Sequence, residues 1–208
     1  MEVLGRLTGL RQALYTVRVS GQISTQSLTQ LNAQLSKVRL FTPVALAVQV
    51  NSSGGAVAQA NLIRQRLLAF SKAHNCPVLT FAEDYAAGGG YIVLAAGNEV
   101  WAHPNSLVGS LAAVGFSLRL KEAAGRYGVE RKVWATSPND LEARFDLFKE
   151  LTPDTKKWLK GVMDTSQEDI KTLVESVRKG KLQVEEAKRD EVLYNGDVFN
   201  GTKAASLG

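Results

Sequence analysis

The sequence predicts an α/β protein with a mainly parallel sheet, flanking helices and one long helix in its C-terminal half. Short apolar runs typical of buried strands alternate with segments whose apolar residues recur every three or four positions, as on one face of a helix. This alternation is typical of a parallel sheet. A long amphipathic stretch also starts at Thr152, with Pro153 at the first helical position, and extends to about Val177.

The first strand and the first helix are indicated by residue type and spacing. Residues 14–19 alternate in polarity and are rich in β-branched side chains, as in a strand, and Ser20 and Gly21 end the run. Ser24 or Thr25 can cap the helix that follows. The apolar face of this helix is formed by Leu28, Leu31, Leu35 and Val38.

The next predicted elements are a strand, a helix and another strand. Residues 44–50 are apolar on both faces, which predicts a central strand covered by helices on each side. Residues 56–73 have helical spacing, and Asn75 and Pro77 are stop signals for this helix. A second buried strand is expected over residues 78–82.

The remainder of the chain continues the alternation without marking a second domain boundary. We therefore expect one domain over residues 1–208, with residues 1–13 as an N-terminal extension. The remaining expected elements are a helix over 91–96, an extended segment over 99–102, a glycine-punctuated segment over 106–112, a helix over 118–127, a strand over 129–135 and a loop over 137–148.

Composition excludes several classes of protein. With 45% hydrophobic and 22% charged residues, the chain is too mixed to be disordered or fibrous. Cys76 is the only cysteine, which rules out an intrachain disulfide and a Cys-rich zinc site. His74 and His103 do not form the HExxH spacing of a catalytic zinc site. We therefore expect neither a metal ion nor another cofactor.

The formal charge of +5 raises the question of an acidic partner, such as nucleic acid or an anionic membrane. Many of the basic residues are interleaved with apolar ones, as on solvated faces, and no nucleic-acid-reading motif accompanies them. Nucleic acid is therefore not the expected partner. No apolar run approaches the roughly 18 residues of a membrane span, so we expect a soluble, intracellular protein without a transmembrane segment.

The opening of the chain bears on its location. Residues 1–18 contain Arg6, Arg11 and Arg18 against a single acidic residue, Glu2, which is compatible with targeting to an organelle such as the mitochondrial matrix. The alternative, which we favour, is an ordinary amphipathic segment that leads into the first strand. The compartment stays open at this point.

Two glycine-rich turns carry the functional signal. Residues 51–55, Asn-Ser-Ser-Gly-Gly, follow the first buried strand, and residues 86–91, Ala-Ala-Gly-Gly-Gly-Tyr, follow the second and open a helix. Ligands of open α/β sheets bind at the carboxyl ends of strands, where backbone N–H groups of loops are available. Such turns can build an oxyanion hole for acyl transfer, because glycine lets the backbone come close. The alternative is that these glycines only make tight turns, and spacing alone supports both interpretations equally.

Further segments match the motifs of one known family. A third motif, Pro-x-Ser-x-x-Gly-Ser, occurs at residues 104–110, and residues 195–204 resemble a closing Gly-Arg-Val-Phe-x-Gly-x-x-Ala pattern, with Asp197 in place of the arginine. With the two glycine turns, these segments resemble in order and spacing the signal peptide peptidase A family of serine peptidases, over nearly the whole chain. The resemblance implies a ClpP/crotonase-like fold and an oligomeric protein whose subunits pack side by side.

The same resemblance implies where catalytic groups should lie. The family uses a serine nucleophile that a lysine activates. The position of the serine is occupied here by Gly88, which has no side chain. The position of the lysine falls among Asp140, Leu141 and Glu142, none of which is a lysine. The backbone donors of the oxyanion and peptide-binding site correspond to Gly54, Gly55 and Gly89.

Other side chains near the expected cleft are candidates for a relocated catalytic pair. The candidate hydroxyls are those of Ser52, Ser53, Ser106, Ser110 and Ser137. Lys132 or Lys149 would have to supply the amine within hydrogen-bond reach of one of them. Cys76 lies before a core strand, and we interpret it as a packing residue rather than a nucleophile.

Four functional hypotheses follow. The favoured one is a catalytically inactive homologue that serves as a structural subunit of a larger homo- or hetero-oligomeric assembly. The second is a working serine-lysine peptidase whose serine has been replaced at Gly88. The third is a non-covalent acyl-CoA enzyme of the crotonase type, with Glu83, Asp84 or Glu142 as its acid or base. The fourth is binding of hydrophobic peptides without cleavage.

Overall fold

The computed structural model describes residues 12–38, 42–115, 118–137, 140 and 144–208. These residues fall into two compact units. The first unit combines the chain up to Ala112 with the chain from Ile170 to Gly208, and the second comprises Ala113–Asp169. Residues 1–11 of the expected N-terminal extension lie outside the described residues, and residues 12 and 13 already belong to the first strand.

The described strands of the first unit form one six-stranded sheet, in the order β1-β2-β3-β5-β6, with β4 also paired to β3. All of these pairs are parallel except β5 with β6, which confirms the prediction of a mainly parallel sheet. The strands are β1 (Gln12–Ser20), β2 (Thr42–Ser52), β3 (Val78–Ala87), β4 (Glu99–Ala102), β5 (Leu107–Gly109) and β6 (Val198–Asn200).

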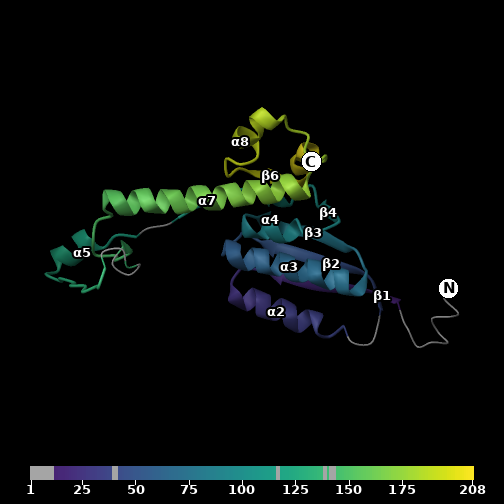
Figure 1. Cartoon of the computed structure of the whole chain (residues 1–208), viewed down its shortest axis with the longest axis horizontal. Coiled ribbons are helices and arrows are strands. Elements are labelled where there is room, and N and C mark those ends of the chain that lie inside the picture. The colour runs from purple at the N-terminus through teal and green to yellow at the C-terminus, as the bar shows by residue number, and fades with distance from the viewer. Residues whose placement is uncertain (1–11, 39–41, 116–117, 138–139, 141–143) are drawn as a thin grey trace. The chain divides into compact units, whose positions relative to one another are not determined.

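One face of the sheet is covered by α2 (Thr25–Leu35), α3 (Val57–His74) and α4 (Gly89–Leu94), which lie side by side (Figure 1). The core lies between these helices and the side chains that β1 to β3 direct toward them. Its fully buried members include Val17, Leu31, Leu46, Val48, Ile63, Leu67 and Val78.

The prediction that helices cover the central strand on each side was wrong. Strands β1, β2 and β3 lie in sequence order, and right-handed crossovers between successive parallel neighbours place all the connecting helices on the same face. The opposite face carries Arg18, Gln49 and Phe81 in one register row, and Trp101 of β4 at the end of that row is 55% exposed. The prediction rested on apolar residues such as Ala45 and Ala47 of β2, which alternate with the residues that face the helices and are nevertheless buried.

Several element boundaries agree with the sequence. Ser24 is the N-cap of α2, and Asn75 adopts a left-handed conformation with φ of 49° where α3 ends. Strand β3 is longer than the predicted segment over residues 78–82, because its first half pairs with β4 and its second half, from Tyr85 to Ala87, pairs with β5. A new partner thus extends the strand through the charged residues Glu83 and Asp84.

The C-terminal part of the first unit packs around the last turns of α7 (Pro153–Val177). It contains η1 (Glu186–Lys188), α8 (Arg189–Val192) and α9 (Gly201–Leu207). Glu175 of α7 accepts a hydrogen bond of 2.8 Å from the Tyr194 hydroxyl and forms an ion pair with Arg189. This carboxylate therefore ties the helix to the segment that leads into β6.

The second unit contains α5 (Lys121–Arg126) and the first turns of α7, which begins at Pro153 as predicted. The predicted strand over residues 129–135 was wrong, since the described structure is irregular there and all but Val133 of these residues are exposed. An alternating pattern forms a strand only where a neighbouring strand pairs with it, and no strand is present among the described residues of this unit. Asp146 is buried nearby, where it accepts the Phe148 N–H at 3.0 Å and lies 3.7 Å from Arg131 Nε.

Candidate active site

The two glycine-rich turns lie against each other at the carboxyl ends of β2 and β3. Register pairs Ser52 with Ala86, so the residues that follow each strand emerge side by side. The contact is close, because a Cβ atom added at Gly54 would lie 3.3 Å from the carbonyl oxygen of Ala87 and 3.8 Å from Cα of Gly88. The fold therefore brings together the two turns that the sequence singled out.

Gly88 forms the sharp corner between β3 and α4. It is the N-cap of α4, with φ of 53° and ψ of −118°, and its N–H donates to the carbonyl oxygen of Gly109 at 2.9 Å. This conformation is rare for residues with a side chain. A Cβ atom would nevertheless fit, since its nearest neighbours, Gly54 Cα and the Ser110 carbonyl oxygen, would both lie 3.7 Å away. The corner thus has room for a side chain, and the residue there has none.

The backbone donors of the turns differ in their availability. The N–H of Gly54 donates to Ser52 Oγ at 3.2 Å, so it is used within its own loop. Among the described residues, no hydrogen bond uses the N–H of Gly55 or of Gly89. These two groups are neighbours, because a Cβ atom added at Gly89 would lie 3.5 Å from the nitrogen of Gly55. An oxyanion or a peptide carbonyl requires two such donors directed at one point, and these two nitrogens lie close enough to be candidates.

The third motif borders the same corner. Strand β5 pairs with the end of β3, and this pairing brings Ser110 beside Gly88. Ser110 itself has φ of 53°, unusual for a residue other than glycine, and its N–H donates to the Asp197 carbonyl oxygen at 2.7 Å. The sequence carries no local signal for this strained position, which follows directly after the antiparallel pairing of β5 with β6.

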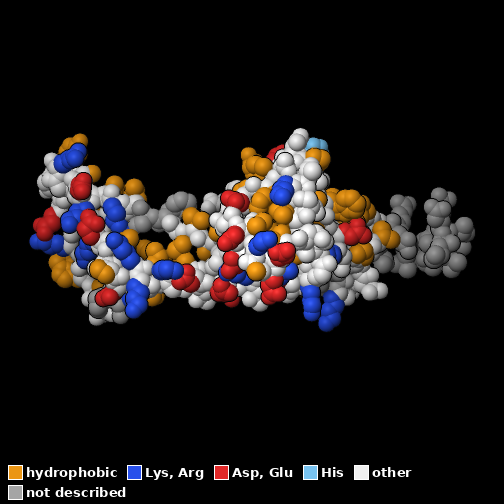
Figure 2. All heavy atoms as spheres, turned by 90° about the horizontal axis from the view of Figure 1, so that it is seen from above, with side chains coloured by type: hydrophobic (Ala, Val, Ile, Leu, Met, Phe, Trp, Pro, Cys, Tyr) orange, Lys and Arg blue, Asp and Glu red, His pale blue; other side chains and the backbone are white. Residues whose placement is uncertain are grey.

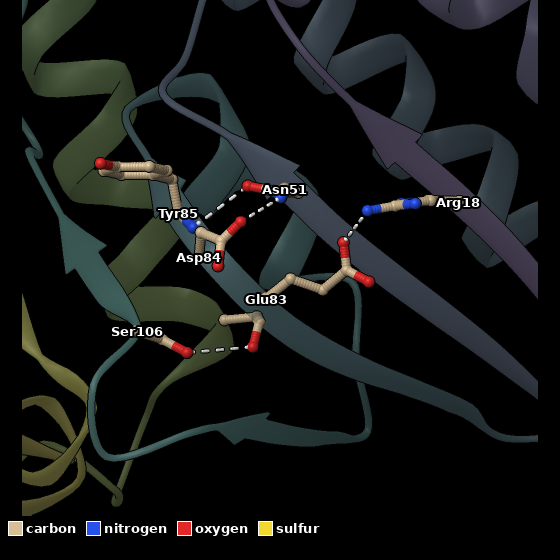
Figure 3. Close-up of polar contacts among 7 residues, drawn as sticks. Arg18, Asn51, Glu83, Asp84, Tyr85 and Ser106 are labelled. Atoms are coloured by element: carbon tan, nitrogen blue, oxygen red, sulfur yellow. Dashed lines mark hydrogen bonds and ion pairs between the residues drawn. The ribbon is translucent and has the colours of Figure 1, made fainter.

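The structure gives structural roles to two of the candidate hydroxyls. Ser52 is 2% exposed, and its hydroxyl interacts with the backbone of Gly54. The hydroxyl of buried Ser106 donates to the Ala82 carbonyl oxygen at 3.2 Å (Figure 3). The same hydroxyl accepts the His103 N–H at 3.1 Å. The Ser52 hydroxyl therefore fastens its own loop, and the Ser106 hydroxyl fastens its loop to β3.

The remaining candidate serines and the candidate amines are divided between the two compact units. Ser53 is exposed beside Gly88, at 3.9 Å between its carbonyl oxygen and a Cβ atom added there. Ser137, Lys132 and Lys149 belong to the second unit, in which exposed Lys132 lies 3.6 Å from Glu130. Asp140 is exposed in the same unit, and Leu141 and Glu142 lie outside the described residues.

Glu83 and Asp84, two of the carboxylates proposed for a crotonase-type reaction, already have partners. Glu83 forms an ion pair with Arg18 at 2.6 Å, and Asp84 accepts a hydrogen bond of 2.8 Å from Asn51 Nδ2 (Figure 3). Asn51 Oδ1 in turn accepts the Tyr85 N–H at 3.3 Å. The Asn51 amide thus joins the ends of β2 and β3, a positioning role that its place in the first motif did not reveal.

The remaining sequence candidates are structural. Cys76 is 4% exposed within the hydrophobic core, where burial raises the pKa of its thiol, in agreement with its interpretation as a packing residue. Within the described ranges, no three His, Cys, Asp or Glu side chains group as metal ligands would. The helices in those ranges also include none with the length and apolarity needed to cross a membrane.

The amino-acid sequence of the chain is similar to those of known proteins. The family model of peptidase family S49 matches residues 71–208. The chain is 28% identical over 177 residues to "Protease 4" of Salmonella typhi, a match covering 85% of this chain and 27% of that protein. It is 26% identical over 201 residues to "Putative protease slr0021" of Synechocystis sp., covering 97% of this chain and 69% of that protein.

A third relative has a name that is not that of a protease. The chain is 35% identical over 164 residues to the "Na(+)/H(+) antiporter NhaA" of Brucella melitensis, a match covering 79% of this chain and 21% of that protein. The chain therefore spans only about a fifth to a quarter of the length of this protein and of the Salmonella protease.

Proposed function

Because the chain belongs to peptidase family S49, we propose that it is a member of this family without peptidase activity that serves as a structural subunit of a larger assembly. The observation that carries the proposal is Gly88, which occupies the corner between β3 and α4 and has no side-chain hydroxyl. An acyl-enzyme cannot form without a nucleophile, so only weak effects of the backbone donors would remain.

The retained fold supports a structural role. A chain that keeps its core and its surfaces can keep its contacts with other subunits after the chemistry is lost. The family match runs through both compact units, from which we infer that they belong to one domain of this family. The partner subunits are proteins rather than nucleic acid under this proposal, and a mitochondrial location is a hypothesis that cell fractionation would test.

An activity assay with two readouts tests the proposal. We expect the purified wild-type protein to leave fluorogenic hydrophobic peptides uncut and to remain unlabelled by a fluorophosphonate, which reacts with activated serines. We also expect the protein isolated from its source to co-purify with other protein subunits. Peptide hydrolysis that is lost when Ser53 or Ser110 is changed to alanine would overturn the proposal, because it would reveal a relocated nucleophile.

Substitution at the corner separates this proposal from the second hypothesis, an interrupted peptidase. Gly88→Ser supplies the hydroxyl, and Gly88→Ala is its matched control, because both side chains impose the same backbone strain. We expect both variants to be inactive, since no lysine occupies positions 140–142. Cleavage by Gly88→Ser but not by Gly88→Ala would favour a peptidase that lost a single group.

Peptide binding without cleavage is a second candidate function. The observation that favours it is the pair of uncommitted N–H groups at Gly55 and Gly89, beside the space left at Gly88. A labelled hydrophobic peptide should then bind saturably, with much weaker binding to Gly88→Leu, whose side chain fills that space, than to Gly88→Ala. Equal binding to both variants would contradict this function.

A further inference from the structure

The face of the sheet opposite α2, α3 and α4 exposes large apolar side chains. Leu14 of β1 is 58% exposed, and Trp101 of β4 is 55% exposed. Register places Leu79 and Phe81 of β3 on the same face, where both are partly buried. We call these four residues the outer patch. Figure 2 shows hydrophobic side chains exposed beside acidic ones on the first unit.

The outer patch is continuous from one side of the sheet to the other. Leu14 is the register partner of Ala45, and Ala47 is that of Leu79, so small apolar side chains fill the space between the larger ones. The Trp101 indole N–H donates to Glu99 Oε2 at 3.3 Å, which leaves the apolar surface of the ring as the part that still faces solvent. A contiguous exposed apolar area of this kind marks a contact site.

The chain enters the sheet beside this patch. Gln12 begins β1 two positions before Leu14, and it directly follows residues 1–11, which lie outside the described residues. The sequence of this segment contains apolar residues at positions 3, 4, 7 and 10, the spacing of one helical face. An amphipathic segment is stabilised in water only when its apolar side is buried, so this segment needs an apolar surface.

The length of the segment matches the width of the patch. Strands β1 and β4 are separated by three strand spacings, about 14 Å. Residues 1–11 span about 16 Å as a helix and about 36 Å when extended, so the segment reaches Trp101 in either conformation. Covalent attachment also gives the segment an effective concentration of about 1 mM at the patch, which favours it over a separate partner.

The charges of the segment and of the patch are complementary. The segment carries Arg6 and Arg11 against a single acidic residue, Glu2. On the sheet, Glu99 is exposed beside Trp101, whereas Glu83 already pairs with Arg18. A basic segment that crosses the patch can therefore place an arginine near the Glu99 carboxylate while its apolar residues cover the tryptophan.

We propose that residues 1–11 fold back over the outer patch of their own chain, with Leu4 and Leu7 packed against Phe81 and Trp101. The opening of the chain then has an intramolecular partner, and the exposed face of the sheet has a cover. This inference goes beyond the structural role proposed above and does not depend on it, because it concerns contacts within one chain.

A fluorescent label on the full chain tests the contact directly. Leu7→Cys carries a bimane, whose fluorescence tryptophan quenches on contact, and Cys76 stays unlabelled because it is buried. We expect fluorescence to rise at least about twofold when Trp101→Phe is added, which corresponds to a docked state in half of the molecules or more. Trp134→Phe, the same change in the second unit, is the control and should leave the fluorescence unchanged.

A second measurement uses the native tryptophans. Leu7→Asp should undock the segment and make Trp101 more accessible to acrylamide, whereas Thr8→Asp, the same charge on the polar side of the segment, should not. The difference should vanish in a Trp101→Phe background. Trp158 stays in every variant as a constant signal, since it is 37% exposed on α7 and the Arg144 guanidinium lies 4.7 Å from its ring centroid.

Two outcomes would overturn the inference. The first is bimane fluorescence that does not respond to Trp101→Phe, which would show that the segment does not reach the patch. The second is renewed quenching when the labelled Leu7→Cys, Trp101→Phe protein is mixed with unlabelled wild type, because a second copy would then supply the tryptophan. Both outcomes leave the proposed structural role unchanged, and peptide hydrolysis by the wild type would contradict that role without affecting the fluorescence.

Discussion

The glycines of the paired turns are required for different physical reasons. At Gly88 only the backbone torsion favours glycine, since φ is 53° whereas a Cβ atom would meet nothing closer than 3.7 Å. At Gly90 close packing excludes a side chain, since a Cβ atom there would lie 2.5 Å from the Ser52 carbonyl oxygen. Gly55 combines both constraints, with φ of 143° and a Cβ position 2.3 Å from the Ile23 carbonyl oxygen.

Alanine substitutions should separate these two effects. We expect Gly88→Ala to lower the free energy of unfolding by about 1–3 kcal/mol, the cost of an unfavourable backbone conformation. Gly90→Ala should cost more, about 3 kcal/mol or above, because a backbone carbonyl must move. Gly21→Ala is a control for torsion alone, since φ is 77° and nothing lies within 4 Å of its Cβ position. Urea denaturation measures all three, and a Gly90→Ala variant no less stable than Gly88→Ala would contradict this assignment.

At the scale of elements, the free edge of β1 is closed by a side chain. Strand β1 pairs only with β2 among the described strands. On its other edge, the Arg18 N–H donates to Gln34 Oε1 at 2.8 Å, and Gln34 Nε2 donates to the Arg18 carbonyl oxygen at 3.0 Å. The primary amide of Gln34 thus takes the place of a neighbouring strand, and an edge occupied in this way is less available to another chain.

Removal of this amide should affect stability and association together. Gln34→Ala breaks two hydrogen bonds between side chain and backbone, and we expect it to lower the free energy of unfolding by about 1–2 kcal/mol. The opened edge should also make the protein aggregate more readily on heating. Gln30→Ala, at an exposed position of the same helix, carries the same gain in helix propensity and serves as the control. Equal melting and light-scattering curves for the two variants would refute the role of Gln34.

For the whole molecule, buried groups set the behaviour at alkaline pH. Burial raises the pKa of Cys76 above its ordinary value of 9.0 and that of Tyr91 above 10.0. Burial, together with the hydrogen bond to Glu175, also raises the pKa of Tyr194. Each group is therefore held protonated in the folded protein at pH values at which the unfolded chain releases its proton.

Stability should consequently fall as pH rises above about 9 to 10, since unfolding then releases protons. Each fully ionised group contributes a slope of about 1.4 kcal/mol per pH unit to the free energy of unfolding. We expect Tyr91→Phe and Tyr194→Phe to flatten this slope relative to the wild type in urea titrations between pH 8 and pH 11. The exposed Tyr127 provides the control, and a Tyr127→Phe variant should follow the wild-type slope. Parallel slopes for all four proteins would show that the buried tyrosines do not ionise on unfolding.

The sequence pattern predicted helix boundaries correctly where the capping and stop residues lie within the helix itself or next to it. The N-cap Ser24, the left-handed Asn75 and the start of α7 at Pro153 all agree with the sequence, because caps and stops depend on the residue's own backbone and hydrogen bonds. The strand expected over residues 129–135 failed, because a strand exists only through a partner. The extension of β3 to Ala87 escaped prediction for the same reason.

The sequence by itself determined the alternation of strands and helices, the two glycine turns and the absence of a side chain at residue 88. These are properties of composition and spacing, which each segment carries alone. Only the tertiary structure decided that Gly54 lies against Gly88, that the three helices share one face and that Trp158 is held exposed on α7. Such features depend on strand order, register and packing between residues far apart in the chain, and no local pattern encodes them.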